Sequence, residues 1–195
     1  MAILSSLVAA VLLTCLGMSL VLLGSAATAL SAHDAQGTAA AYEAQAAAML
    51  AASEVRVRPD WSGVWSAGVP ADVSAAPGRL ADATFFPRAP WDGSSIDLHA
   101  LTTARQAESD GALPPGVAGP VWRLFEYGPI SRLVPSDPSG HARYVVVWVA
   151  DGRGGVVLLH ATAFGAAGVR ASVEASVGLR PGAAAPSRLA IRSVP

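Results

Sequence analysis

The sequence predicts an α+β protein in which a long N-terminal hydrophobic helix packs, at its C-terminal half, on a small antiparallel β-sheet of about four strands. Three observations predict this class. Residues 2–23 are uncharged and mostly apolar, residues 39–52 are rich in strong helix formers, and the last third contains short β-branched and aromatic runs between turn residues. We expect four regions: the N-terminal helix over 1–58, an irregular connection over 59–120, the sheet over 121–180 and a flexible tail over 181–195.

The composition limits both the size of the protein and its partners. With the apolar tract set aside, 195 residues leave enough chain for one modest domain and too little for two full cores. The formal net charge of -1, from 13 basic and 14 acidic residues, gives no basic excess that would attract a phosphate backbone, so we expect no nucleic-acid partner. Cys15 is the only cysteine, so an intramolecular disulfide is impossible and the head domain has to be stabilised by its core.

The N-terminal tract from Ala2 to Leu23 has the length that a hydrocarbon core of about 30 Å requires of a membrane-spanning helix. A cleaved secretory signal is the alternative, because Ala27-Thr28-Ala29 has the small-x-small form that signal peptidase accepts. The apolar run, however, is longer than the roughly 7 to 15 residues typical of a signal, and no basic residue precedes it. These two features favour a retained membrane anchor.

The helical pattern continues beyond the apolar tract. No proline occurs before Pro59, which is expected to end the helix because its ring cannot continue the hydrogen-bond ladder. The stretch Ser31–Thr38 is a weaker helix former, so it is the place where this helix could bend or locally melt. Further on, side chains recur at three- and four-residue steps and form one narrow stripe. We expect the following residues to pack on the sheet: Tyr42, Ala46, Met49, Leu50, Ser53 and Val57.

The region from Trp61 to Pro120 carries scattered prolines and irregularly spaced apolar residues, which is typical of a connection that wraps the surface. The pattern also allows a short helix over Leu98–Asp110, with Ser95 or Asp97 as its N-cap. We therefore expect little regular structure between the long helix and the sheet.

The last third of the chain predicts the strands. Four segments consist of β-branched or aromatic runs bounded by turn residues: Val121–Tyr127, Tyr144–Val149, Val156–Phe164 and Val169–Val177. In the last segment apolar and polar residues alternate, which is typical of a strand with one face on the core and the other in water. The glycine-bearing connections at 151–155 and 165–168 are short enough for hairpins, so the last three strands should form an antiparallel meander. The tail from Pro181, rich in Ala, Pro and Ser, is expected to be poorly ordered.

Short motifs along the chain resemble a known family. Residues 28–33 (TALSAH) followed by residues 41–47 (AYEAQAA) resemble the PilX-type minor pilins of the type IV fimbrial biogenesis group, in which a T-x-I-A-A-N stretch leads into Y-A-A-(D/E)-A-G. The head is similar to one bacterial branch of that group at three places: residues 59–61 (PDW), 120–129 (PVWRLFEYGP) and 144–151 (YVVVWVAD). The motifs span most of the chain, and their order carries the resemblance. None of them is catalytic.

The resemblance implies a pilin-like fold and a structural role. A minor pilin is a non-enzymatic subunit of a type IV pilus or pseudopilus-like system, anchored in the inner (cytoplasmic) membrane by a single span with its head outside the cytoplasm. The implied partners are the lipid bilayer and other pilin-like subunits, with no small-molecule substrate. Membrane helices associate through small residues that let backbones approach. On the N-terminal helix we expect that surface at Leu7, Ala10, Thr14, Gly17, Leu20 and Gly24.

The chain departs from the family pattern at its start. Family members begin with a short basic leader ending in Gly and usually carry Glu at the fifth mature position, whereas this sequence shows no acidic residue before Asp34. We expect that the true start codon lies further upstream; the alternative is a protein that no prepilin peptidase processes. A second functional hypothesis also stays open, a secreted or periplasmic binding module matured near Ala29.

The sequence contains no pattern typical of an enzyme, so we expect no catalytic activity, no metal and no cofactor. The histidines, which lack ligand spacing, are His33, His99, His141 and His160. Scattered loop carboxylates are usually solvated or capping groups, and here they are Asp60, Asp72, Asp82, Asp92 and Asp97. Residues 152–155 join two predicted strands and do not open a helix, which indicates a hairpin turn and not a phosphate-binding loop.

The tryptophans are either core anchors or an exposed contact surface. Trp122 and Trp148 lie in predicted strands and are expected to be buried. Trp65 and Trp91 lie in the irregular connection and are candidates for contact with a partner.

Overall fold

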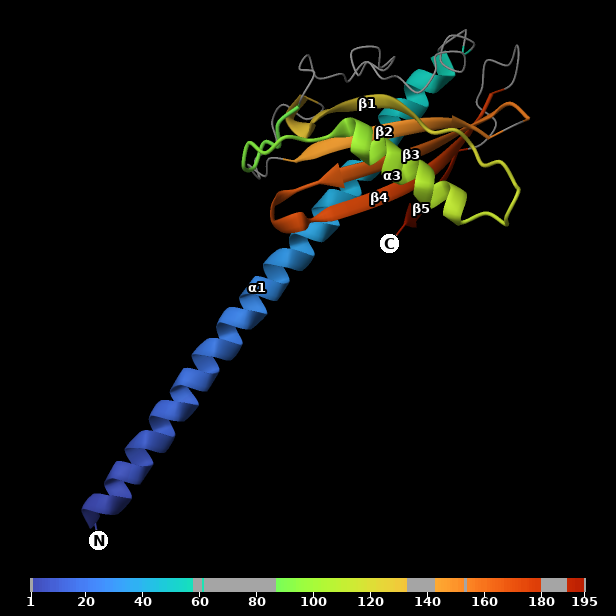
Figure 1. Cartoon of the computed structure of the whole chain (residues 1–195). Coiled ribbons are helices and arrows are strands. Elements are labelled where there is room, and N and C mark those ends of the chain that lie inside the picture. The colour runs from blue at the N-terminus through green and yellow to red at the C-terminus, as the bar shows by residue number, and fades with distance from the viewer. Residues whose placement is uncertain are drawn as a thin grey trace. The chain divides into compact units, whose positions relative to one another are not determined.

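The computed structural model describes residues 2–57, 61, 87–132, 143–152, 154–179 and 189–194. The chain divides into two compact units, Met1–Thr38 and Ala39–Pro195 (Figure 1). The helix α1 runs from Ala2 to Val57 and includes the weak stretch at 31–38, where it remains α-helical. The predicted long helix is therefore confirmed.

The second unit contains one antiparallel sheet of five strands in the order β1-β2-β3-β4-β5, so each strand pairs with its neighbour in the chain. The strands are β1 (Arg123–Pro129), β2 (Tyr144–Asp151), β3 (Val156–Phe164), β4 (Arg170–Gly178) and β5 (Leu189–Val194). The first four correspond to the predicted segments, and the meander of β2, β3 and β4 is confirmed. The α+β class is as predicted, with one strand more than expected.

The prediction of a poorly ordered tail is wrong for residues 189–194, which form β5. These residues pair with β4 over six positions, from Val177↔Leu189 to Ser172↔Val194. The preceding residues, rich in Ala, Pro and Ser, have the composition of a loop, and composition alone gave no sign of the strand. Pairing with β4 satisfies the backbone hydrogen bonds of this segment and makes a strand of it.

The glycine-bearing connections form turns, as predicted. Gly154 and Gly155 have φ of 62° and 76°, values that glycine adopts without steric cost, and the Gly152 N–H donates to the Val156 carbonyl over 2.9 Å. The next connection contains a short 3₁₀ turn, Ala166–Gly168, in which Ala167 also has positive φ. The backbone thus reverses at the two places that the glycines marked.

Helix α3 (Leu98–Gly111) covers the face of the sheet opposite to α1 (Figure 1). It begins where the Asp97 carboxylate accepts a hydrogen bond from Ala100 N over 2.8 Å, so the predicted helix and one of its two predicted caps are confirmed. The predicted alternation in β4 is confirmed, with Val173, Ala175 and Val177 buried and the side chains of Ser172, Glu174 and Ser176 partly exposed. The polar face is only partly in water because α3 packs on the same side of the sheet.

The face of α1 that packs on the sheet is not the predicted one. The buried apolar residues of α1 are alanines and one valine, each at most 2% exposed: Ala40, Ala44, Ala47, Ala48, Ala51, Ala52 and Val55. Glu54 is also buried, at 8% exposed. The predicted stripe lies on the opposite side, with Tyr42 and Val57 each 70% exposed and Met49 46% exposed; Ala46, Leu50 and Ser53 are exposed too. Alanine has no side chain beyond Cβ, so an alanine face lets the helix approach the β-branched sheet surface closely, which larger side chains would prevent.

Candidate functional site

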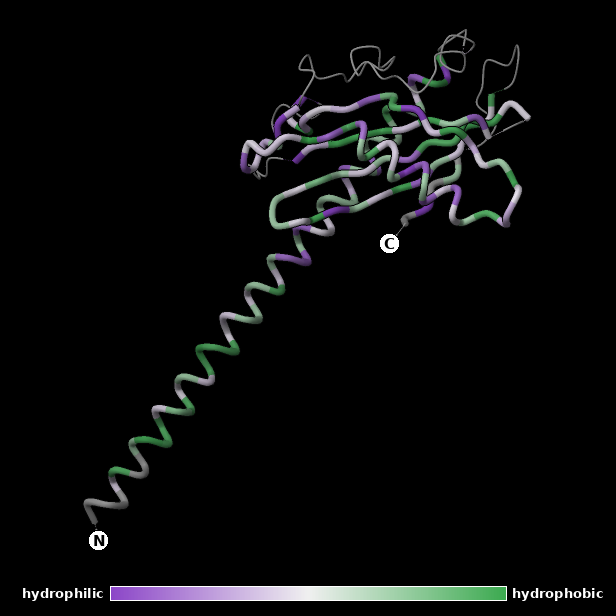
Figure 2. The backbone as a smooth tube through the Cα atoms, viewed as in Figure 1, coloured by the Kyte–Doolittle hydropathy of each residue, from purple (hydrophilic) through white to green (hydrophobic). Residues whose placement is uncertain are grey.

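The N-terminal part of α1 presents an apolar surface with no covering element among the described residues. Its large apolar side chains are 55–72% exposed: Leu7, Val11, Leu12, Leu13, Leu16, Met18, Leu20, Val21, Leu22, Leu23 and Leu30. Figure 2 shows this run of hydrophobic residues along the first unit. Water-soluble proteins bury such a surface, so this one requires a lipid or protein partner. By length and composition, α1 is able to cross a membrane; a signal sequence has the same properties.

Several hydroxyl side chains of this segment donate hydrogen bonds to backbone carbonyls of the helix itself. Thr14 Oγ1 donates to the Ala10 carbonyl over 2.7 Å, and Ser19 Oγ donates to the Cys15 carbonyl over 2.8 Å. Thr28 Oγ1 makes contacts of the same kind, 3.1 Å from the Gly24 carbonyl. An apolar environment offers no hydrogen-bond partners, so a hydroxyl placed there has to bond within its own helix, as these do.

The predicted helix-association residues lie on one side of α1, because their spacings of three, four and seven residues return to one side of an α-helix. Leu7 is 64% and Leu20 is 71% exposed. A Cβ atom added at Gly17 or Gly24 would meet no atom within 4 Å, so both positions leave the backbone open to close approach. The remaining two residues of this set, Ala10 and Thr14, are exposed as well. Their role in association stays a prediction.

In the second unit, α1 is fixed to the sheet by an ion pair in addition to its alanines. Arg143, at the start of β2, donates to the carboxylate of Glu43 on α1. The two side chains are only 3% and 16% exposed. The stem of Arg143 runs 3.6 Å from the position that a Cβ on Gly165 would take, so the connection after β3 packs against it. Glu43 lies in the segment that carries the family resemblance, and no local pattern indicates its partner 100 residues away.

The outer face of α1 in this unit is defined by Tyr42, Ala46, Met49, Leu50 and Val57, all of them exposed. These are the residues predicted to pack on the sheet. Because the alanine face already occupies the sheet, this face is available to a partner. We call it the outer stripe.

A buried polar cluster lies between α3 and the sheet. Arg105 of α3 pairs with Glu174 of β4 over 2.7 Å, and its guanidinium carbon lies 4.4 Å from the ring centroid of Trp122. Next to it, His160 is 1% exposed, with Nε2 3.2 Å from Thr162 Oγ1 and Nδ1 3.6 Å from Glu174. Arg105 and His160 are enclosed by packed side chains, whereas the Glu174 side chain is 38% exposed.

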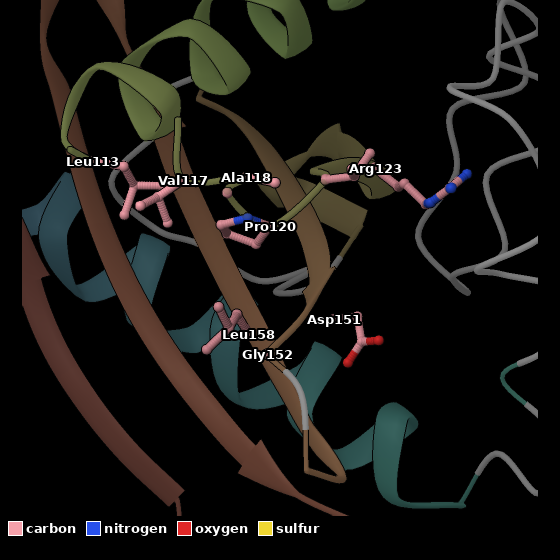
Figure 3. A pocket seen from close by; sticks show the side chains of 10 residues that line it. Leu113, Val117, Ala118, Pro120, Arg123, Asp151, Gly152 and Leu158 are labelled. Carbon is pink, nitrogen blue, oxygen red and sulfur yellow. The ribbon is translucent and has the colours of Figure 1, made fainter. Parts of the chain in front are cut away.

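The second unit also has an open pocket of roughly 520 Å³ at the end of the sheet where the β2–β3 hairpin lies. Figure 3 shows apolar side chains on one side of it and those of Arg123 and Asp151 on the other. The apolar lining includes Leu113, Val117, Pro120 and Leu158. The lining comes from three separate segments of the chain, so no local pattern could have indicated the pocket.

The structure also places some of the histidines and loop carboxylates that the sequence analysis considered. Among the described residues no group of three or more His, Cys, Asp or Glu is placed to hold a metal ion. Asp92 accepts a hydrogen bond from Ser94 N over 2.9 Å, and the hydrogen bonds from Ser94 hold the pKa of this carboxyl below its ordinary value. His33 and His99 are exposed on α1 and α3. The other candidates, Asp60, Asp72, Asp82 and His141, lie outside the described residues.

The predicted burial of Trp122 and Trp148 is confirmed, whereas contact of Trp91 with a partner stays a prediction. Trp122 and Trp148 are 4% and 2% exposed, and Trp91 is partly exposed. Trp65 lies outside the described residues. The prediction made no assignment for Trp61, which is buried against Phe125 with ring centroids 5.8 Å apart and donates to the Val55 carbonyl over 3.3 Å.

No protein-family model matches the chain, and neither curated proteins nor solved structures provide a match. The architecture is nevertheless pilin-like. A long, N-terminally apolar helix packs through its C-terminal part on one face of an antiparallel sheet. The motif resemblance to PilX-type minor pilins remains an expectation from the sequence.

Proposed function

We propose that the protein is a non-enzymatic, minor-pilin-like subunit of a type IV pilus or pseudopilus-like assembly. It is anchored in the inner membrane by α1, with its head outside the cytoplasm, before it enters or primes the assembly. The observation that supports this most is the exposed apolar surface of α1, which belongs to the same continuous helix as the alanine face docked on the sheet. A helix of this kind provides lipid contact before assembly and subunit contact afterwards.

The outer stripe supports the same proposal. Within the second unit it is an exposed, mostly apolar face of α1 on the side opposite to the alanine face that packs on the sheet. A contiguous exposed apolar surface typically marks a protein–protein or membrane interface. The partner that fits is another apolar helix of a pilin-like subunit.

The anchoring step is tested by charges in the apolar segment. Leu13→Arg with Leu16→Arg places two arginines at positions that are 70% and 61% exposed near the middle of the apolar tract. At the centre of a spanning helix each arginine raises the free energy of membrane insertion by about 2.5–3.5 kcal/mol. We therefore expect the variant to be absent from the carbonate-washed membrane fraction. We also expect surface filaments to be lost. The measurement is quantitative fractionation together with filament imaging in a gene-deletion background.

The matched control adds the same two charges at exposed positions of α3, Thr103→Arg with Ala104→Arg, and should leave the protein in the membrane. Membrane retention of the Leu13/Leu16 variant, or filaments that do not depend on the gene, would contradict the proposal.

The alternative is the secreted or periplasmic module with a cleaved signal. Residues 39–195 form a compact unit that holds every buried residue of α1, so a product cleaved after Ala29 would keep its core. Intact mass of the mature protein separates the two functions. We expect a mass that includes residues 2–29, and a product lacking them would favour the secreted module because the anchoring surface would be gone.

A further inference from the structure

His160 lies in the middle of the sheet face that α3 covers. In the strand register it is opposite Trp148 of β2 and Glu174 of β4, and side chains at paired positions of an antiparallel sheet share a face. Its ring centroid is 5.7 Å from that of Trp148 and 6.0 Å from that of Trp122. Two indoles and the helix above therefore separate the imidazole from water.

The charged groups around His160 come from each element packed there. Helix α3 contributes Arg105 and Glu108, strand β4 contributes Arg170 and Glu174, and β5 places Arg192 opposite Glu174. Arg105 holds the Glu174 carboxylate at 2.7 Å, whereas His160 Nδ1 is 3.6 Å away and makes no hydrogen bond. The carboxylate charge is thus engaged by Arg105 and is poorly placed to stabilise an imidazolium.

The contact between α3 and the sheet depends largely on polar groups. The buried residues of α3 are Leu98, Thr102 and Arg105. Trp148 Nε1 donates to Thr102 Oγ1 over 2.8 Å, and the backbone N–H of Trp122 donates to Gln106 Oε1 over 2.9 Å. A small apolar contact of this kind makes α3 a candidate for local opening that leaves the sheet folded.

Opening of α3 and proton binding by His160 are coupled. With α3 in place, burial and then the charges of Arg105 and Arg170 lower the pKa of His160 to about 3. When α3 lifts, Arg105 leaves with it, the imidazole meets water, and its pKa returns to about 6.5. Above pH 6.5 neither state binds the proton. Below pH 6.5 only the open state binds it, so acid favours opening until about pH 3.

We propose that α3 is an acid-released cover over the aromatic face of the sheet, with His160 as the group that senses the proton. Because the imidazole accepts a proton only when α3 has lifted, protonation holds α3 in the open state, in which the ion pair between Arg105 and Glu174 is broken. The opened face presents the side chains of Trp122, Tyr144 and Trp148. The inference does not depend on the proposed pilin-like function.

Amide hydrogen exchange of the full-length chain in detergent micelles tests the proposal, with rates corrected for intrinsic exchange at pH 7.5 and pH 5.0. The ordinary pKa of histidine lies between these two values, whereas the ordinary pKa values of Asp and Glu lie below both. We expect the opening constant of the α3 amides to rise about 30-fold between the two, as a group with pKa 6.5 in the open state requires. The sheet amides of β2 and β3 should stay more strongly protected than those of α3 at both pH values.

Two variants assign the effect to one residue. His160→Gln should reduce the pH effect on α3 to less than about 3-fold, because it removes the only histidine that α3 and the two indoles enclose among the described residues. The reverse variant, with His33, His99 and His141 all changed to Gln, leaves His160 as the only histidine and should keep the full effect. It keeps the proposal testable even if His160→Gln does not fold. Three results would overturn the proposal. They are equal protection of α3 and the sheet at both pH values, an opening of α3 that does not depend on pH, and loss of the pH effect in the reverse variant.

Discussion

Glu43→Ala is expected to lower the free energy of unfolding by about 3–5 kcal/mol, because it leaves the guanidinium of Arg143 buried without its carboxylate. Arg143 is 3% exposed, so water cannot replace the lost partner. A loss of this size is a large part of the roughly 5–15 kcal/mol that stabilises a typical domain. The measurement is chemical denaturation of the full-length chain in detergent, followed by tryptophan fluorescence.

The matched control is Glu108→Ala. Glu108 also pairs with an arginine, but its side chain is 55% exposed and Arg105 keeps Glu174, so we expect a loss below about 1 kcal/mol. The double variant Glu43→Leu with Arg143→Met should recover most of the stability, since well-packed apolar residues replace buried ion pairs at little or no cost. Equal losses for Glu43→Ala and Glu108→Ala would mean that the ion pair does not hold α1 on the sheet.

The second large effect concerns the alanine face of α1. Ala47 is fully buried in the core between α1 and the sheet, so Ala47→Leu adds a side chain where there is no space. Overpacking of this kind typically costs about 1–3 kcal/mol. Denaturation under the same conditions measures it as a lower midpoint with an unchanged slope.

Its neighbour provides the control. Ala46 is exposed in the outer stripe, and Leu is nearly as good a helix former as Ala, so Ala46→Leu should change stability by no more than about 0.5 kcal/mol. If Ala46→Leu destabilised the protein more than Ala47→Leu, α1 would pack on the sheet through the outer stripe and not through the alanine face.

Local features of the fold were predictable from the sequence. The bounds of α3 and its cap at Asp97 follow from short-range preferences, and so do the turns at Gly154 and Gly155. The same is true of the exposed apolar tract, whose length and lack of charge are properties of a single segment. Each of these depends on residues that are close together in the chain.

The candidate site was less predictable because its parts are distant in the chain. Glu43 meets Arg143 across 100 residues, and Arg105 meets Glu174 across 69. Residues 189–194 become a strand because β4 offers its edge, which the composition of the tail does not reveal. No periodicity within one segment encodes such pairings.

The long apolar helix and the head with an antiparallel sheet follow from the sequence, because periodicity, turn residues and the absence of charge act within single segments. The face of α1 that packs on the sheet depends instead on contacts between distant parts of the chain. The larger side chains of Tyr42 and Met49 formed the more visible stripe, yet the flat β-branched surface packs best against alanines that allow close approach. The outer stripe is therefore left exposed, and with it the surface through which we propose the protein assembles.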